Sequence, residues 1–322
     1  IYILIIGASL LFSGCGGSPQ ATISCSVAEL TSAIVDANAN PDHDHIILPE
    51  ACDFELGEVK YEIPDEGYQS DLEYVGLPSI TSPITITGNN SRIFRSTIPG
   101  TSDFRIFHIG PGGSLTLYGL TLENGSVIFY GGAILMTGGT LSINQVEFSN
   151  NHAVDYGGAI ATYDWSLEVG RASEIYIINS VFRNNSASAG GAVYIGTGLL
   201  DVDFESLFEF NQASSGGAIR FRGQSLTIYN STIQYNEADY GGGIRSNGDT
   251  VTLQGVNILD NIGDVGGGMD VYSGTLIIRD SQFKRNQANW GGGLHLLWPD
   301  TTISGTIFYE NIANEYGGGI CL

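Results

Sequence analysis

The sequence predicts an all-β fold in which one chain winds into a parallel β-helix behind a short capping helix. Glycine accounts for 45 of the 322 residues, well above average usage. Gly-Gly pairs recur about every 25 residues from residue 131 onward, and apolar and polar residues alternate after each pair. We therefore expect a signal peptide and tether over residues 1–20, a cap with the first coils over 21–112, and repeated coils over 113–322.

The first residues have the pattern of an export signal. Residues 1–11 are almost wholly apolar but too few to span a bilayer. They lead into Leu-Phe-Ser-Gly-Cys, which resembles a bacterial lipobox and predicts lipidation of Cys15. Because Gly16 is not the Asp that favours retention in the inner membrane, we expect an outer-membrane or cell-surface lipoprotein, or an extracellular protein. The missing initial Met and an unfinished last coil predict a longer gene at both ends.

The other cysteines suggest one disulfide. An exported chain can hold disulfides, and Cys25 and Cys52 form a natural pair 27 residues apart once Cys15 carries lipid. The alternative is that both remain free thiols. Cys321 is left unpaired near the end of the chain.

A capping helix is predicted directly after Cys25. Ser26 to Glu29 has the capping-box pattern, and Val27, Leu30 and Ile34 follow helical spacing. Pro41 ends the helix, and strands are expected at 45–49, 84–86, 105–107 and 115–117, with an acidic, irregular segment over 53–79. Such a helix would cover the open end of a stack of strands.

Two columns of residues define the repeat, where a column means the same position in successive coils. Gly-Gly pairs begin at 131, 157, 190, 216, 241, 266, 291 and 317, and the one long interval predicts an insertion around residues 163–171. Glycine permits tight turns and close approach of backbones, whereas stacked asparagine side chains can hydrogen-bond along the axis. We give both columns a structural role. The asparagines are Asn151, Asn185, Asn211, Asn236, Asn261, Asn286 and Asn311.

The residues after each pair alternate with a period of two, which is typical of strands. The third residue after the first glycine is always apolar and is predicted to face inward. The next residue is mostly polar and is predicted to face outward; this column comprises Leu135, Ala161, Tyr194, Arg220, Arg245, Asp270, His295 and Cys321. Three short strands joined by tight turns would make one coil.

Residues 121–322 resemble a known family. Segments such as Asn-Asn-His-Ala-Val-Asp-Tyr-Gly-Gly-Ala-Ile (150–160) are similar to the repeat of chlamydial polymorphic outer membrane proteins. The cap is similar to that of bacterial surface β-helix proteins. The resemblance implies a right-handed, pectin-lyase-like β-helix at the cell surface in a family regarded as adhesins, and it carries over no catalytic residue. Later coils depart from it, with Gly-Gly-Gly in place of Gly-Gly-Ala.

One flank of the predicted stack gathers residues suited to ligand binding. Aromatic side chains stack on sugar rings, and neighbouring carboxylates bind Ca²⁺ or act as acid and base. The simpler interpretation is a solvated strand face whose opposite charges offset one another. The candidate ligand-binding residues are Asp239, Asp264, Asp270, Arg220, Arg245, His295, Tyr240 and Trp290, and the candidate Ca²⁺ ligands are Asp155, Asp239 and Asp264.

These observations favour a non-catalytic, monomeric surface protein that binds glycan or a host-cell surface. The acids follow a repeat column and do not converge on one coil, so no catalytic residue is assigned. No cofactor is expected apart from Ca²⁺, and membrane contact is expected through the lipid anchor only. A net charge of −22 repels phosphate backbones, so no nucleic-acid partner is expected. The alternatives are a polysaccharide lyase or glycoside hydrolase of the pectin-lyase-like fold, and a structural surface-layer component.

Overall fold

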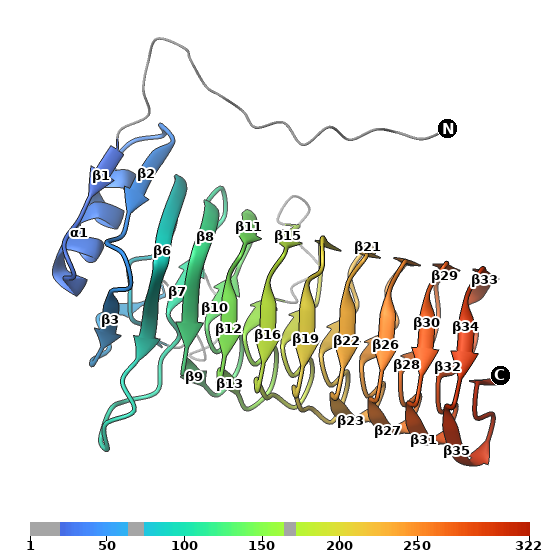
Figure 1. The fold of residues 1–322 in the computed structure, drawn as a ribbon. Coiled ribbons are helices and arrows are strands. Elements are labelled where there is room, and N and C mark those ends of the chain that lie inside the picture. Colours follow the sequence, from blue (N-terminus) through green and yellow to red (C-terminus); the bar gives the residue numbers. More distant parts are fainter. Residues whose placement is uncertain (1–19, 64–73, 164–171) are drawn as a thin grey trace.

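The computed structural model describes residues 20–63, 74–163 and 172–322 (Figure 1). Within these ranges the chain forms one helix and a long stack of short strands, each coil lying on the one before. The signal peptide and the lipidation of Cys15 lie outside the described residues, as does nearly all of the insertion expected around residues 163–171.

Helix α1 (Val27–Asn38) lies at the N-terminal end of the stack, where the sequence predicts a cap (Figure 1). The Ser26 hydroxyl accepts a hydrogen bond from the Glu29 amide at 3.4 Å, which satisfies one free donor of the first turn. Leu30 and Ile34 are fully buried, and the helix contacts strands β2 (Asp44–Ile47), β3 (Asp53–Leu56) and β6 (Pro83–Arg95).

The segment behind the helix is more ordered than the sequence suggests. Cys25 and Cys52 form the predicted disulfide, with their Cα atoms 5.8 Å apart. The prediction that residues 53–79 are irregular is wrong at its start, because strand β3 pairs in parallel with β6. Phe54 and Leu56 are buried while Asp53 and Glu55 are exposed, so this acidic segment still alternates with the period of a strand.

A typical coil contains four short strands, one more than predicted. β20 (Ile219–Phe221), β21 (Ser225–Tyr229), β22 (Thr232–Gln234) and β23 (Glu237–Tyr240) follow one another around one turn of the solenoid. Each pairs in parallel with its counterpart in the next coil, so all four faces extend along the stack.

The β20 face is a nine-stranded parallel sheet, called here the nine-stranded sheet. Its other strands are β7 (Phe107–Ile109), β10 (Ile134–Met136), β14 (Ile160–Thr162), β17 (Val193–Ile195), β24 (Ile244–Ser246), β28 (Met269–Val271), β32 (Leu294–Leu296) and β36 (Ile320–Cys321). The β23 face continues through β27 (Ile262–Val265), β31 (Gln287–Trp290) and β35 (Ile312–Tyr316), and the equivalent earlier pair is β9 (Ser126–Val127) with β13 (His152–Ala153).

The β21 and β22 faces belong together to a nineteen-stranded sheet. It also contains β1 (Gln20–Thr22), β2, β3, β6, β8 (Ser114–Glu123), β11 (Thr140–Asn144), β12 (Glu147–Ser149), β15 (Glu174–Ile178), β16 (Val181–Arg183), β18 (Leu199–Asp203), β19 (Leu207–Glu209), β25 (Thr250–Gln254), β26 (Asn257–Leu259), β29 (Thr275–Arg279), β30 (Gln282–Lys284), β33 (Asp300–Ser304) and β34 (Ile307–Tyr309). Strands β4 (Tyr61–Glu62) and β5 (Tyr74–Val75) form a separate antiparallel pair beside the stack.

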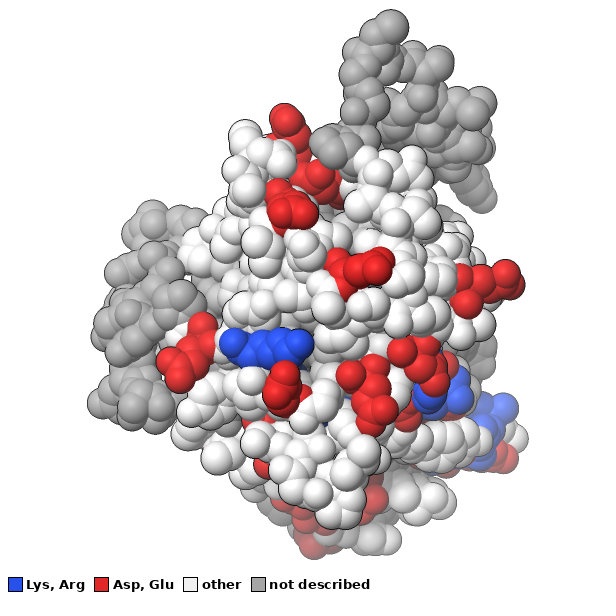
Figure 2. Space-filling view, turned by 90° about the vertical axis from the view of Figure 1, so that its left-hand side faces the viewer, with Lys and Arg blue, Asp and Glu red and all other residues white. Residues whose placement is uncertain are grey.

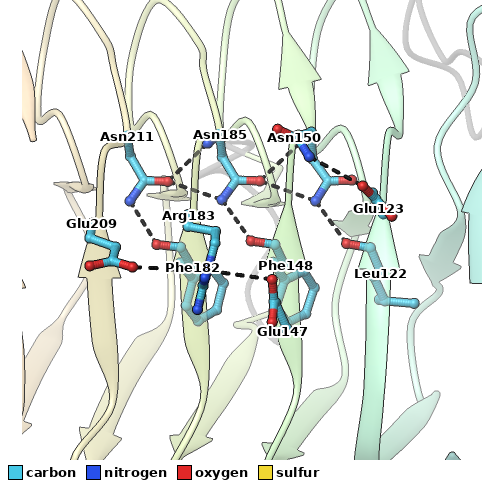
Figure 3. A network of polar contacts seen from close by, with 11 residues as sticks. Leu122, Glu123, Glu147, Phe148, Asn150, Phe182, Arg183, Asn185, Glu209 and Asn211 are labelled. Atoms are coloured by element: carbon cyan, nitrogen blue, oxygen red, sulfur yellow. Dashed lines mark hydrogen bonds and ion pairs between the residues drawn. The ribbon is translucent and has the colours of Figure 1, made fainter. Parts of the chain in front are cut away.

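The asparagine column forms the predicted ladder inside the stack (Figure 3). The amide group of Asn185 donates to Asn211 Oδ1 at 3.0 Å and to the Phe148 carbonyl at 3.0 Å. Asn185 Oδ1 in turn accepts from the backbone and side-chain nitrogens of Asn151. Beside the ladder, the rings of Phe148, Phe182 and Phe208 stack with their planes 2° apart. These columns join neighbouring coils and need no functional explanation.

The glycine pairs are likewise required by the turns they form. Gly216 has a φ of +69°, and a Cβ on it would collide with the Ile219 carbonyl. A Cβ on Gly217 would collide with the carbonyl of Gly242 in the next coil. The first glycine therefore permits the turn and the second permits the coils to stack.

Charge on the surface follows the acidic composition. At the end of the molecule that carries α1, acidic side chains are spread over the surface and basic ones are few (Figure 2). Within the described residues, no helix is long and apolar enough to cross a bilayer.

Candidate functional site

The outward side of the nine-stranded sheet brings four predicted site residues together. Arg220, Arg245, Asp270 and His295 lie on β20, β24, β28 and β32 and are direct neighbours in the parallel register. The inward residues on either side of them are buried, so the alternation fixes the charged side chains on the outer face. We call β20, β24, β28 and β32 the open part of the sheet.

Asp270 is the centre of a polar network in the open part. Its Oδ2 lies 3.2 Å from Arg245 Nε, and its Oδ1 lies 2.8 Å from His295 Nδ1. The side chain of Asp270 is only 6% exposed, so both carboxylate oxygens are engaged away from bulk water. Arg245 also donates to Ser215 Oγ at 3.2 Å and lies over the Tyr240 ring, with 4.4 Å from Cζ to the ring centroid.

An aromatic groove of about 470 Å³ lies beside this network, between the nine-stranded sheet and the β23 face. Six predicted residues line it: Tyr240, Arg245, Asp264, Asp270, Trp290 and His295. Five further residues complete the lining: Val265, Tyr272, Asn289, Leu297 and Glu315. The groove therefore combines exposed aromatic rings with charged groups, as sites for polar ring-shaped ligands do.

The aromatic side chains of the groove are held by neighbouring residues. Trp290 Nε1 donates to Glu315 Oε2 at 2.8 Å, and its ring meets Tyr316 edge-on, with centroids 5.9 Å apart. Tyr272 makes a similar contact with Trp298 at 5.3 Å. Tyr240, Tyr272 and Trp290 all remain exposed, although Arg245 covers one face of the Tyr240 ring.

Two predicted site residues lie next to the aromatic groove and do not line it. Arg220 lies beside Arg245 on the preceding strand of the sheet, one coil nearer the N-terminus. Asp239 lines a second depression of about 400 Å³, which shares Asp264 with the aromatic groove. A single flank was predicted, and the structure separates it into two neighbouring depressions.

The carboxylates proposed for calcium do not form a cluster of ligands. Asp155, Asp239 and Asp264 follow the β23 face in different coils. Among the described residues, no group of three or more His, Cys, Asp or Glu side chains is arranged to hold a metal ion. Asp264 Oδ1 instead accepts a hydrogen bond from Asn289 Nδ2 at 3.3 Å.

The outward column is mostly polar, as predicted, but its first members are buried. Leu135 and Ala161 face outward on β10 and β14 but are fully buried. Leu135 forms a second hydrophobic cluster with Ile63 and Val75, which come from the β4–β5 region. We call β7, β10 and β14 the covered part of the sheet.

His108 occupies the same column on β7 and is also buried. Its Nδ1 is 2.8 Å from Ser79 Oγ and its Nε2 is 3.0 Å from Thr137 Oγ1. Burial, reinforced by the charge of Arg105, lowers the pKa of His108 to about 3. A neutral histidine is therefore part of the covered structure.

Sequence reasoning missed Tyr272 and Leu297, although a signal was present. Both occupy the position directly after the third strand residue, where earlier coils have Arg222 and Asn247. Reading that column together with its neighbours would have placed them beside Asp270 and His295. Glu315 stands two residues before its glycine pair, as Asp264 and Asn289 do, so the sequence placed it on this flank although it was not selected as a candidate.

Comparison with known families agrees with the geometry. Residues 166–322 match the family described as the right-handed beta helix region, and residues 145–163 match the Chlamydia polymorphic membrane protein repeat. The chain is a right-handed parallel β-helix. No curated protein and no solved structure matches it. The repeat suggests a family of outer-membrane or surface proteins, and the Cys25–Cys52 disulfide is consistent with a location outside the cytoplasm.

Proposed function

We propose that this β-helix is a non-catalytic cell-surface protein that binds glycan in the aromatic groove. The observation that carries the proposal is the row of exposed rings, Tyr240, Tyr272 and Trp290, beside the Arg245–Asp270–His295 network. Apolar ring faces and fixed hydrogen-bonding groups together suit a sugar, which has an apolar face and polar edges. The matched surface-protein repeat supports display outside the cell.

The same network supports a second candidate, a polysaccharide lyase or hydrolase. A histidine held by a buried carboxylate at 2.8 Å is an arrangement that general bases use. The non-catalytic proposal is preferred because the carboxylate that contacts His295 is itself paired with Arg245, and among the described residues no second carboxylate joins this network as a partner acid or base.

A glycan panel tests the proposal with the full-length chain and two variants. Trp290→Ala should weaken binding by about tenfold or more, the size of effect expected for a central aromatic contact. The control is Tyr309→Ala, an exposed aromatic residue on β34 of the other sheet, which should leave binding unchanged.

Assays for cleavage separate the two candidates. Release of reducing ends or unsaturated sugars, with or without Ca²⁺, and its loss in His295→Gln would show an enzyme and overturn the non-catalytic proposal. Absence of binding to every glycan would favour a structural surface-layer role.

A further inference from the structure

Two arginines stand side by side at the edge of the aromatic groove. Arg220 on β20 pairs directly with Arg245 on β24, so their positions are separated by one inter-strand spacing of about 4.8 Å. Arg222 lies two residues further along β20's chain and donates to the Tyr194 hydroxyl at 3.2 Å. In a chain with 12 basic against 34 acidic residues, two arginines in register on neighbouring strands are unusual.

The two arginines differ in how they are neutralised. Arg245 forms an ion pair with Asp270 at 3.2 Å. Arg220 is partly buried, yet within the described part of the chain it has no carboxylate at ion-pair distance, and its Nη1 donates to the Phe221 carbonyl at 3.2 Å. Burial and the neighbouring Arg245 lower the pKa of Arg220 to about 10.

A partly buried guanidinium without a carboxylate in contact is costly, because it has lost water and the nearby charge of Asp270 compensates it only in part. The cost is recovered when an anion binds, since the planar guanidinium can donate two parallel hydrogen bonds to two oxygens of one oxyanion. The two arginines also lie close to the aromatic rings, since Arg245 lines the groove and lies over Tyr240. A ligand whose anionic group is bound by the arginines would therefore place its ring in the aromatic groove.

We propose that Arg220 and Arg245 form an anion subsite of the aromatic groove, which makes its ligand an acidic glycan carrying carboxylate or sulfate groups. This inference rests on the proposed glycan binding and names its ligand class. General electrostatic attraction cannot supply the same preference, because the net charge of −22 repels polyanions at long range. Selectivity for acidic sugars must therefore arise locally.

Matched ligands test the subsite by calorimetry. The probes are a uronic-acid oligosaccharide, the same oligosaccharide as its neutral methyl ester, and a sulfated and a neutral glycan of similar length. The full-length chain should bind one of the acidic probes about tenfold or more tightly than its neutral counterpart, as expected for a charge-assisted hydrogen bond. The uronate and sulfate arms decide which oxyanion is recognised.

Arg220→Gln should abolish this preference and leave binding of the neutral probe unchanged, while Arg220→Lys should keep part of it. Folding of the variants is checked by circular dichroism, and it is expected to persist because the same column accepts Ala161 and Leu135. Arg279→Gln, an exposed arginine on β29, is the control. Equal binding of acid and ester, or a preference that survives Arg220→Gln, overturns the subsite. If acidic and neutral glycans bind equally well and both lose binding in Trp290→Ala, the anion subsite is wrong but the proposed glycan binding is supported.

Discussion

The covered and open parts of the nine-stranded sheet have similar inward residues but different surroundings outside. Ile134 in the covered part and Ile244 in the open part are both fully buried in the central core. Outside, Leu135 packs completely beneath Ile63 and Val75, whereas Arg245, four positions later in the same column, faces the aromatic groove. The difference shows that the solenoid supplies a constant scaffold, and that a binding surface remains only where no other segment covers it.

The ladder that both parts share should be the most sensitive element. Asn185→Ala removes acceptors and donors from buried partners, including the Asn151 amide and the Phe148 carbonyl. We expect a loss of roughly 3–5 kcal/mol in the free energy of unfolding, since each buried group left unpaired costs about 1–3 kcal/mol. Urea unfolding followed by circular dichroism measures the loss.

The neighbouring Asn184 provides the matched control. It is exposed and has a φ of 55°, so Asn184→Ala should cost only about 1 kcal/mol, the strain of a left-handed alanine. Equal losses in the free energy of unfolding for Asn184→Ala and Asn185→Ala would show that the buried ladder does not contribute the stability expected of it.

The two parts of the sheet should respond differently to the same truncation. Leu135→Ala opens a cavity beneath Ile63 and Val75 and should destabilise the protein by about 2–5 kcal/mol. Arg220→Ala, in the same column of the open part, should change stability by no more than about 1 kcal/mol. Thermal unfolding of both variants compares them, and similar losses would mean that the open part is as tightly packed outside as the covered part.

The sequence predicted the features that repeat in every coil, but not which part of the nine-stranded sheet is covered by another segment. Repetition identified the Asn185 ladder, and alternation identified the outward direction of Arg245, because both depend on contacts between equivalent positions in successive coils. Leu135 lies outside that rule, since its burial depends on Ile63 and Val75, which belong to no repeat. For the same reason the division between covered and open sheet, and with it the limits of the candidate site, became visible only in three dimensions.

A gradual effect, small for each pH unit, concerns the protonation of the covered part. The pKa of His108 is lowered to about 3 in the folded protein, against about 6.5 in an unfolded chain. Below about pH 6.5 the unfolded chain takes up a proton that the folded state refuses, so this histidine's contribution to stability is complete above pH 6.5 and is lost as the pH falls toward 3. The loss is about 1.4 kcal/mol for each pH unit within that window.

Comparison of His108→Gln with the unmodified chain isolates this effect from the carboxylates that titrate in the same range. Glutamine can still reach the hydroxyls of Ser79 and Thr137 but takes up no proton, so the variant should lose stability less steeply between pH 6.5 and 4. With each pH unit of acidification, the free energy of unfolding of the unmodified chain should therefore fall further than that of the variant. Parallel profiles would show that water reaches His108, and the covered part would then have to be regarded as open at this end of the sheet.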